Sequence, residues 1–176
     1  MALVGADKHV EAERVMRGTI AASRRVLGDE HPDNLKSAAN LAVVLIRRRK
    51  HADAERILRE VLPLMRLALG EEHRSTLLAA ANLSTALIGQ EKLEEAERVS
   101  DQLREIQLRV LGSDHPDSLA TSNNLAYVLA RRANVARAET VYRSLLESHR
   151  RVYGDTHPKT SETIGRLLEI VRFKKQ

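Results

Sequence analysis

Histidines are the residues of this sequence best suited to metal or acid–base chemistry, and four of the seven recur at a constant spacing. They are His31, His73, His115 and His157, each 42 residues after the last. A zinc site needs its ligands about 2.0–2.1 Å from one ion. Residues that recur once per stacked unit stand about 10 Å apart, the ordinary helix-to-helix distance. We therefore interpret these four as loop histidines that hydrogen-bond to the backbone rather than as metal ligands.

Other chemistry finds equally little support. The chain has no cysteine, which removes thiolate nucleophiles and thiolate metal ligands. It has no Gly-x-Ser-x-Gly elbow and no glycine-rich phosphate loop, and His9, His51 and His149 show no ligand spacing. Glu55, Glu97 and Glu139 are periodic as well, so we interpret them as helix-surface or inter-repeat residues. The sequence predicts no catalysis, no cofactor and no metal.

The period itself is the strongest feature of the chain. The segment from Leu27 to Asp33, Leu-Gly-Asp-Glu-His-Pro-Asp, recurs with substitutions at 69–75, 111–117 and 153–159, and the spacing never changes. A period of 20–50 residues is typical of a stacked repeat array. Such arrays mostly present extended binding surfaces.

Each 42-residue unit predicts two helices, A and B. Pro32 suits the first turn of an A helix, where its missing N–H is not needed, and Gly70 suits a residue of positive φ that ends a B helix. Between them, apolar residues recur at three- and four-residue steps, which predicts two amphipathic helices. Only four residues of the chain are aromatic, so the core must be built from small aliphatic side chains. The two stripes are Leu35, Ala38, Leu41, Ala42 and Leu45, then Ala54, Ile57, Leu58, Val61, Leu62, Met65 and Leu69.

The frame at the two ends predicts eight helices in a single repeat domain over residues 7–173. Residues 7–27 match a B helix alone, and residues 154–173 match an A helix alone. Three complete repeats lie between them, at 28–69, 70–111 and 112–153.

These motifs resemble the 42-residue tetratricopeptide repeats of kinesin light chains and related proteins. The pattern is Leu-Gly-x-x-His-Pro-x-x-Leu, then Asn-Leu-Ala, then Ala-Glu-Arg, and it begins here at Leu27, Asn40 and Ala54. The resemblance implies an all-α solenoid, a right-handed superhelix of antiparallel helix pairs, that serves as a non-catalytic protein-interaction scaffold. Arg74 departs from the family by replacing the loop proline. Arg49, Glu91 and Ala133 stand where the A–B turn usually has glycine.

The resemblance further implies a concave groove lined by the A helices, where kinesin light chains accept acidic peptides. Helical phase nominates one face of each A helix. We expect this face to bind a peptide with acidic side chains. The periodic amides have two interpretations that stay open: a ladder that binds a peptide backbone, or satisfied amides that tie adjacent helices together. The predicted groove residues are Lys36, Ala39, Asn40, Val43 and Arg47; Leu78, Ala81, Asn82, Thr85 and Ile88; and Ala120, Asn123, Asn124, Tyr127 and Arg131.

Two other hypotheses concern partners. The unpaired terminal helices expose apolar residues such as Val15 and Leu168, so copies of the chain could associate head to tail; alternatively, the chain is a fragment of a longer array.

The net charge of +5 and a pI near 9.8 permit binding of nucleic acid, but stacking aromatics are nearly absent, so this hypothesis is the weakest. No apolar run approaches the roughly 18 residues of a membrane span, and we expect a cytoplasmic protein.

Overall fold

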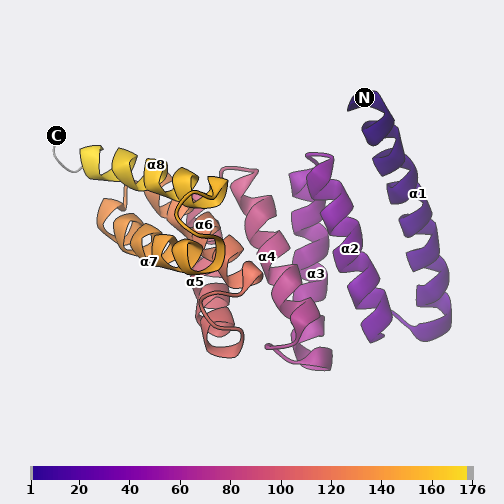
Figure 1. Ribbon diagram of the computed structural model, residues 1–176. Helices are drawn as coiled ribbons and strands as arrows, with labels where there is room; N and C mark the ends of the chain where they lie inside the picture. Colours follow the sequence, from indigo (N-terminus) through magenta and orange to yellow (C-terminus); the bar gives the residue numbers. More distant parts are fainter. Residues whose placement is uncertain (1, 174–176) are drawn as a thin grey trace. The chain divides into compact units, whose positions relative to one another are not determined.

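The computed structural model describes the backbone of residues 2–173 and the side chains of residues 10–172. Within this range the chain forms eight α-helices and no strand, as the sequence predicts (Figure 1). It divides into two compact units, Met1–Lys92 and Leu93–Gln176. The first unit holds α1 (Ala2–Leu27), α2 (Pro32–Arg47), α3 (His51–Leu69) and α4 (Arg74–Ile88). The second holds α5 (Leu93–Val110), α6 (Pro116–Arg131), α7 (Val135–Tyr153) and α8 (Pro158–Phe173).

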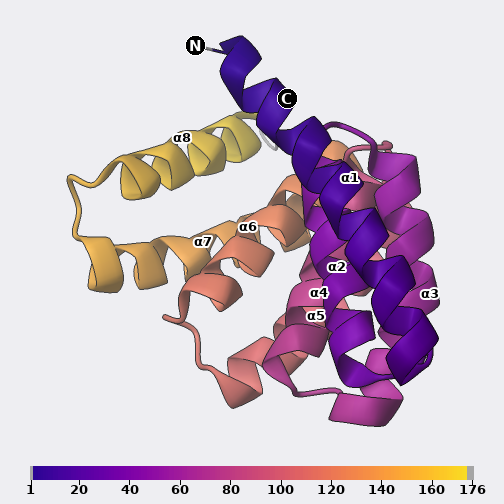
Figure 2. The ribbon, with the colours of Figure 1, turned by 90° about the vertical axis from the view of Figure 1, so that its right-hand side faces the viewer.

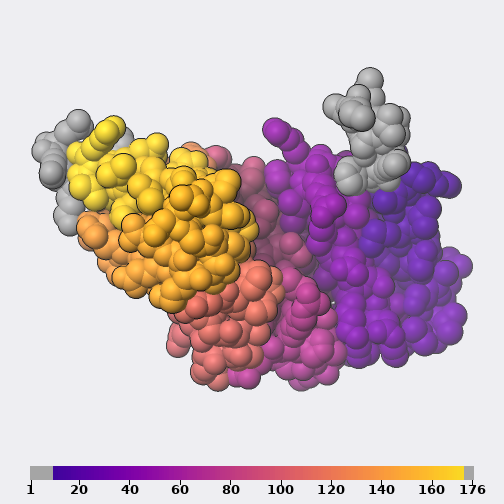
Figure 3. Space-filling view, in the orientation of Figure 1, coloured from indigo at the N-terminus to yellow at the C-terminus, as the bar shows by residue number. Residues whose placement is uncertain are grey.

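Within each unit, helices that follow one another in sequence pack against one another. In the first unit α1 packs on α2, α2 on α3 and α3 on α4, and α2 also touches α4. The helix α1 forms one side of this unit (Figure 3). In the second unit α5 packs on α6, α6 on α7 and α7 on α8. The helix α7 runs antiparallel to both α6 and α8 (Figure 2). The expected lone B helix, 7–27, corresponds to α1, which begins five residues earlier, at Ala2.

The four periodic histidines start the A helices. Each is the residue before its helix, and its Nδ1 accepts a hydrogen bond from the backbone N–H two residues on. The N···N distances are 3.3 Å for Asp33 to His31, 3.1 Å for Ser75 to His73, 3.1 Å for Asp117 to His115 and 3.2 Å for Lys159 to His157. Each bond satisfies one of the N–H groups that a helix start leaves unpaired. The prediction of backbone-bonding loop histidines is confirmed.

Small residues lie where the helices cross. Ala54, Ala96 and Ala138 hold the same place in α3, α5 and α7 and are fully buried. A methyl side chain lets the helix backbones approach closely, which matches the aliphatic composition. The core of the second unit is built around one buried aromatic, Tyr142, with the aliphatic residues Leu119, Leu125, Ala126, Leu129, Ala138, Val141, Leu145 and Ile170.

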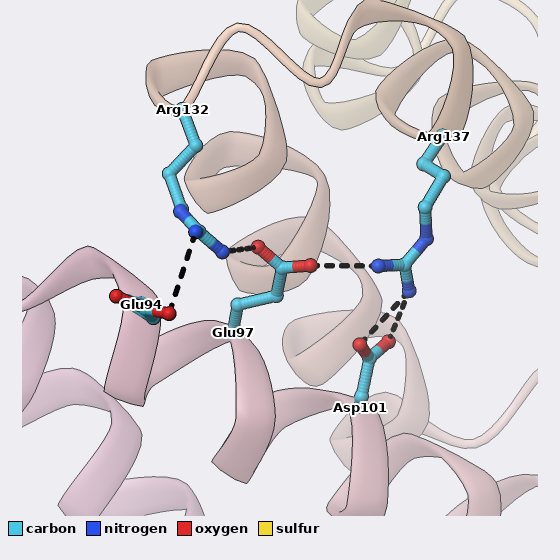
Figure 4. Close-up of polar contacts among 5 residues, drawn as sticks. All are labelled: Glu94, Glu97, Asp101, Arg132 and Arg137. Atoms are coloured by element: carbon cyan, nitrogen blue, oxygen red, sulfur yellow. Dashed lines mark hydrogen bonds and ion pairs between the residues drawn. The ribbon is translucent and has the colours of Figure 1, made fainter.

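Three periodic glutamates of the B helices are bonded to polar residues 35–40 positions further along the chain, and we call these contacts the inter-repeat bonds. Glu13 accepts from Arg48 and Lys50. Glu55 accepts from Gln90 and Lys92, the latter at 2.8 Å. Glu97 accepts from Arg132 and Arg137 (Figure 4). Of the two roles predicted for the periodic glutamates, Glu55 and Glu97 have the inter-repeat one, and Glu139 pairs with Arg143 of its own helix at 2.8 Å.

These bonds shift the titration of two of the carboxyls. Burial by itself raises the pKa of Glu13 and of Glu55, because it disfavours the charged form. Hydrogen bonds outweigh that effect, from Lys50 and Arg17 to Glu13 and from Lys92 and Gln90 to Glu55, and the pKa of each carboxyl falls below its ordinary value. Both glutamates are therefore held as carboxylates in the folded chain.

Candidate functional site

The periodic amides lie on the A helices without partners. Asn40 is exposed, and Asn82 and Asn124 are half-buried. Among the described residues, none of these three side chains makes a hydrogen bond to another group of the chain. The interpretation that they tie adjacent helices together is therefore wrong. Their donors and acceptors are available to a ligand, which is what the other interpretation requires.

In the first unit the predicted residues lie on α2 and α4, and most of them are half-buried. Lys36 places Nζ 3.3 Å from Oδ1 of Asp33, and Arg47 is exposed. Thr85 donates its hydroxyl to the carbonyl of Ala81 at 3.0 Å, one helical turn back. This bond leaves the Thr85 oxygen as an acceptor only. Ala39, which helical phase also nominated, is buried with 7% of its surface exposed, so it belongs to the packed side of α2.

In the second unit the predicted residues of α6 line two hollows that α6 shares with α8. The first encloses about 220 Å³ and the second about 170 Å³. Asn123 lines the first, Tyr127 and Arg131 line the second, and Asn124 lines neither. The structure thus places four predicted residues of α6 beside the two hollows, Ala120 among them. The first hollow is formed by Pro116, Leu119, Ala120, Asn123, His149, Tyr153, Lys159, Glu162 and Thr163. The second is formed by Tyr127, Ala130, Arg131, Tyr142, Arg166, Glu169 and Ile170.

A stacked aromatic pair shapes the first hollow. The rings of Tyr153 and His157 lie 4.7 Å apart at 20°. Lys159 places its ammonium 4.8 Å from the centre of the Tyr153 ring and 3.4 Å from its hydroxyl. A cation over a ring face is attracted by the ring quadrupole. The tyrosine ring and the lysine charge are thereby held together at the edge of the hollow.

His149 lines the same hollow as a neutral base. Its Nδ1 lies 3.0 Å from Oγ1 of Thr163, and that hydroxyl donates to the carbonyl of Lys159 at 2.9 Å. Because the hydroxyl has one proton, Nδ1 must carry the hydrogen of the imidazole, which leaves Nε2 as an acceptor. Burial lowers the pKa of His149 below its ordinary value, because the cation would lose its hydration.

The second hollow holds an ordered cation beside an aromatic ring. Arg131 donates from Nη1 to the Tyr127 hydroxyl at 2.8 Å, and its guanidinium carbon lies 5.8 Å from the centre of the ring. Opposite them, Arg166 lies 3.7 Å from the carboxylate of Glu169. The α6–α8 face therefore combines cations with two exposed acids, Glu169 here and Glu162 in the first hollow.

Sequence reasoning missed the contribution of α8. Glu162, Arg166 and Glu169 stand 42 residues after Ala120, Asn124 and Tyr127. Continuing the same repeat step into the last helix would have nominated them. The 42-residue step was the signal for these residues. The apolar residues of the same helix instead favoured the hypothesis that chain ends associate.

Comparison with known proteins places the chain in a family. The model of the tetratricopeptide repeat matches residues 1–67, 36–99 and 75–147, which together span most of the chain. The chain belongs to the tetratricopeptide repeat family. Proteins of this family generally act as protein-interaction scaffolds, and their fold is that of a non-catalytic scaffold. No curated protein sequence matches the chain significantly.

Solved structures confirm the solenoid fold. Two crystal structures of a Podosopora anserina putative kinesin light chain with nearly identical TPR-like repeats share 23% identity with this chain. They match 98% of it and 81% and 82% of their own chains, with TM-scores of 0.86 and 0.85. BtubC (BKLC) of P. vanneervenii shares 20% identity over 94% of this chain and 66% of its own, with a TM-score of 0.78. The expected likeness to kinesin-light-chain repeats is confirmed.

In the described part of the chain, no group of three or more His, Asp or Glu residues could hold a metal ion. None of the eight helices combines the length and apolar character that crossing a bilayer requires, over the residues that the structure describes.

Proposed function

We propose that this chain is a cytoplasmic interaction scaffold, one repeat domain over residues 7–173, that binds a peptide segment in a concave groove lined by its A helices. The observation that carries the proposal is the row formed by Asn123, Tyr127 and Arg131 beside the two α6–α8 hollows. Family membership supports the general role, because tetratricopeptide repeat proteins generally mediate contacts between proteins. Buried main-chain groups of a bound peptide need hydrogen-bond partners, and the unpaired amides of Asn40, Asn82, Asn123 and Asn124 can supply them.

The charges of the α6–α8 face define the peptide more closely. The positive charges of Arg131, Arg166 and Lys159 favour carboxylates of the peptide, while Glu162 and Glu169 favour a basic or amide residue at one or two places. We therefore expect a peptide that is acidic overall, with one aromatic or aliphatic side chain for each hollow. Arginine is well suited to the acidic contacts, since its guanidinium can bind a carboxylate through two parallel hydrogen bonds.

The test uses the whole chain and a peptide selected against it from a library of acidic sequences. Changing both Asn123→Ala and Tyr127→Ala removes an amide and a ring contact, and we expect the affinity, measured by fluorescence anisotropy, to fall by roughly tenfold or more. Circular dichroism should show unchanged helicity. Arg98→Ser, a change at an exposed residue of α5, is the control and should bind normally. Unchanged affinity in the double variant would show that the peptide binds elsewhere.

A second candidate, head-to-tail association, is favoured by the exposed apolar surface of α8. Leu168 is 54% exposed, whereas Ala126 and Ala42, which hold the same repeat position, are fully buried beneath the following B helix. In α1, however, the polar Thr19 stands where Val61, Leu103 and Leu145 are buried. Polar substitution of an outer face is typical of a terminal repeat. Light scattering over a concentration series separates the two candidates, because a strict monomer excludes association.

A further inference from the structure

The first unit contains a separate hollow between its first three helices. It encloses about 270 Å³, and its floor is apolar. Ile20 of α1, Ala38 and Leu41 of α2 and Ile57 of α3 line it, each with 8% or less of its surface exposed. Pockets for drug-sized ligands run from about 300 to 1,000 Å³, so a hollow of this size suits one large side chain.

This hollow lies on the side of α2 away from the proposed peptide face. Successive residues of an α-helix turn by about 100°. Ala38 and Leu41, which line the hollow, are therefore turned away from Asn40 and Arg47 by about 100° to 180°. A ligand in the hollow would not touch the amide-bearing face, and the two surfaces can be tested independently.

Three arginines and one glutamate form the walls. Arg17 donates from Nε to Glu13 at 3.1 Å. Arg24 reaches Glu60 at 3.4 Å through Nη2, and its Nε lies 3.5 Å from the Asp29 carboxylate, an ion pair without hydrogen-bond geometry. Arg56 is exposed and makes no polar contact among the described residues. The walls thus carry three arginines against one glutamate, and Arg56 faces no carboxylate of the described chain, so the hollow favours an acidic ligand.

The second unit shows what closes such a hollow. Two repeat steps of 42 residues take Ile20 to Arg104 and Ala38 to Ser122. There, Arg104 donates from Nε to the Ser122 hydroxyl at 3.0 Å, so the chain's own side chain occupies the gap between α5 and α6. The same steps replace the wall arginines Arg24 and Arg56 by Leu108 and Thr140. The first unit therefore has no counterpart of Arg104 inside the gap, and it has Arg24 and Arg56 on the walls where the second unit has no arginine.

We propose that the hollow between α1, α2 and α3 binds an acidic segment of a partner protein, with one leucine-like side chain on the apolar floor and a carboxylate on each side of it. Arg17 and Arg24 are seven residues apart on α1, about 10 Å along the helix axis. In a peptide with the polyproline II conformation, which has three residues per turn, residues i and i+3 lie on the same face about 9 Å apart. The segment that fits has acids at these two positions and the aliphatic residue between them. Arg56 faces the same carboxylates from α3.

The probe is a short fluorescein-labelled peptide with the core Glu-Leu-Ser-Glu in a Gly/Ser sequence, measured by anisotropy at about 0.15 M salt, where distant charges are screened. Two matched probes carry Ser in place of Leu, or Gln in place of both Glu. We expect one-site binding of the first probe to the whole chain and a loss of roughly tenfold or more for each matched probe, because apolar burial and charge each contribute. Equal binding of the Ser probe, or no binding of the first, overturns the proposal.

The decisive variant copies the second unit into the first. Ile20→Arg with Ala38→Ser should close the hollow and abolish binding, although it adds a positive charge. Binding at the wild-type level would overturn the proposal. Arg56→Ser should weaken binding several-fold, and Arg98→Ser, the same repeat position in α5, should not. If the double variant fails to fold, Arg56→Ser and the Ser probe decide. Asn123→Ala with Tyr127→Ala should leave this binding intact, so failure here and failure of the proposed function are distinguishable.

Discussion

Arg137 of α7 donates from Nη1 to Oε1 of Glu97 on α5 at 2.6 Å, across 40 residues of sequence (Figure 4). The other terminal nitrogen of the same guanidinium donates to both oxygens of Asp101, at 2.9 and 2.8 Å. Glu97 and Asp101 are one turn apart on α5, so one arginine joins two successive turns of one B helix to the next B helix. The two acids differ in burial, since 10% of the Glu97 side chain and 38% of the Asp101 side chain are exposed.

This difference in burial predicts unequal costs for removing each charge. Glu97→Gln leaves Arg132 and Arg137 without their shared, nearly buried carboxylate. We expect a loss of about 1–3 kcal/mol in the free energy of unfolding, because both arginines are partly exposed and recover some hydration. Asp101→Asn, which alters the same Arg137 at the surface, should cost less than about 0.5 kcal/mol. Urea unfolding of the two variants measures both values, and equal costs would contradict the assignment.

The A–B turns hold a non-glycine residue in a backbone conformation that disfavours side chains. Arg49, Glu91 and Ala133 have φ values of 57°, 60° and 56°, in the left-handed region where a side chain is disfavoured. Each turn is closed by a bond to the carbonyl five residues back, such as Asn134 N–H to Leu129 at 2.9 Å, which is the Schellman pattern of helix ends.

Glycine at this place should therefore stabilise the chain. Ala133→Gly relieves the left-handed conformation, and we expect a gain of up to about 1 kcal/mol in the free energy of unfolding after the added freedom of the unfolded chain is counted. Ala120→Gly, an exposed position inside α6, should instead lose about 1 kcal/mol. Thermal unfolding of the two variants should move in opposite directions. A loss in both would show that the turn gains nothing from glycine.

The sequence predicts the fold well because the same local signals recur in every repeat. The histidine before each A helix and the glycine that ends each B helix both depend on neighbouring residues alone. Gly28, Gly70, Gly112 and Gly154 indeed have φ between 83° and 95°. Ala39 shows why helical phase alone does not assign a face correctly. It is the neighbour of the exposed Asn40, and a shift of one residue turns a helix by about 100°, from the exposed side to the packed side.

Contacts between repeats are harder to predict because their partners change position. Lys50 and Lys92 bind the B-helix glutamates of the first unit, but Asn134 holds that repeat position in the second, and Arg137 takes over from three residues further on. Aligning the repeats shows that Asn134 replaces the lysine, but it does not show that Arg137 bonds to the glutamate instead. The hollow of the first unit cannot be predicted from the sequence for a similar reason. It depends on two repeat positions at once, which hold Ile20 and Ala38 in the first unit but Arg104 and Ser122 in the second.

Ser118 and Thr160 occupy the same position of α6 and α8 and are both fully buried, yet they differ in bonding. Thr160 donates to the carbonyl of Gly154 at 2.8 Å, whereas the Ser118 hydroxyl has no partner in the described part of the chain. Thr160→Ala should cost about 1–3 kcal/mol, because it removes the donor to the carbonyl of Gly154, a half-buried residue, and a buried methyl group. Ser118→Ala should be neutral or stabilising. Chemical denaturation tests the pair, and an equal loss in both would contradict this account.

His149 should make the second unit less stable in mild acid. Its pKa is lowered in the folded chain, first by burial and then by the nearby charge of Lys159. Below the ordinary histidine pKa of about 6.5 the unfolded chain takes up a proton that the folded chain refuses, so stability is present above that pH and is lost as the pH falls through the folded pKa. Met65 holds the same repeat position in α3 and is fully buried, so His149→Met offers a matched variant that does not titrate. We expect the wild-type free energy of unfolding to fall, relative to that of His149→Met, between about pH 7.5 and about pH 5.5. The four histidines that start the A helices are present in both proteins, so their own response to acid cancels in the difference. A constant difference between the two proteins across this range would mean that His149 is protonated equally in the folded and unfolded chain.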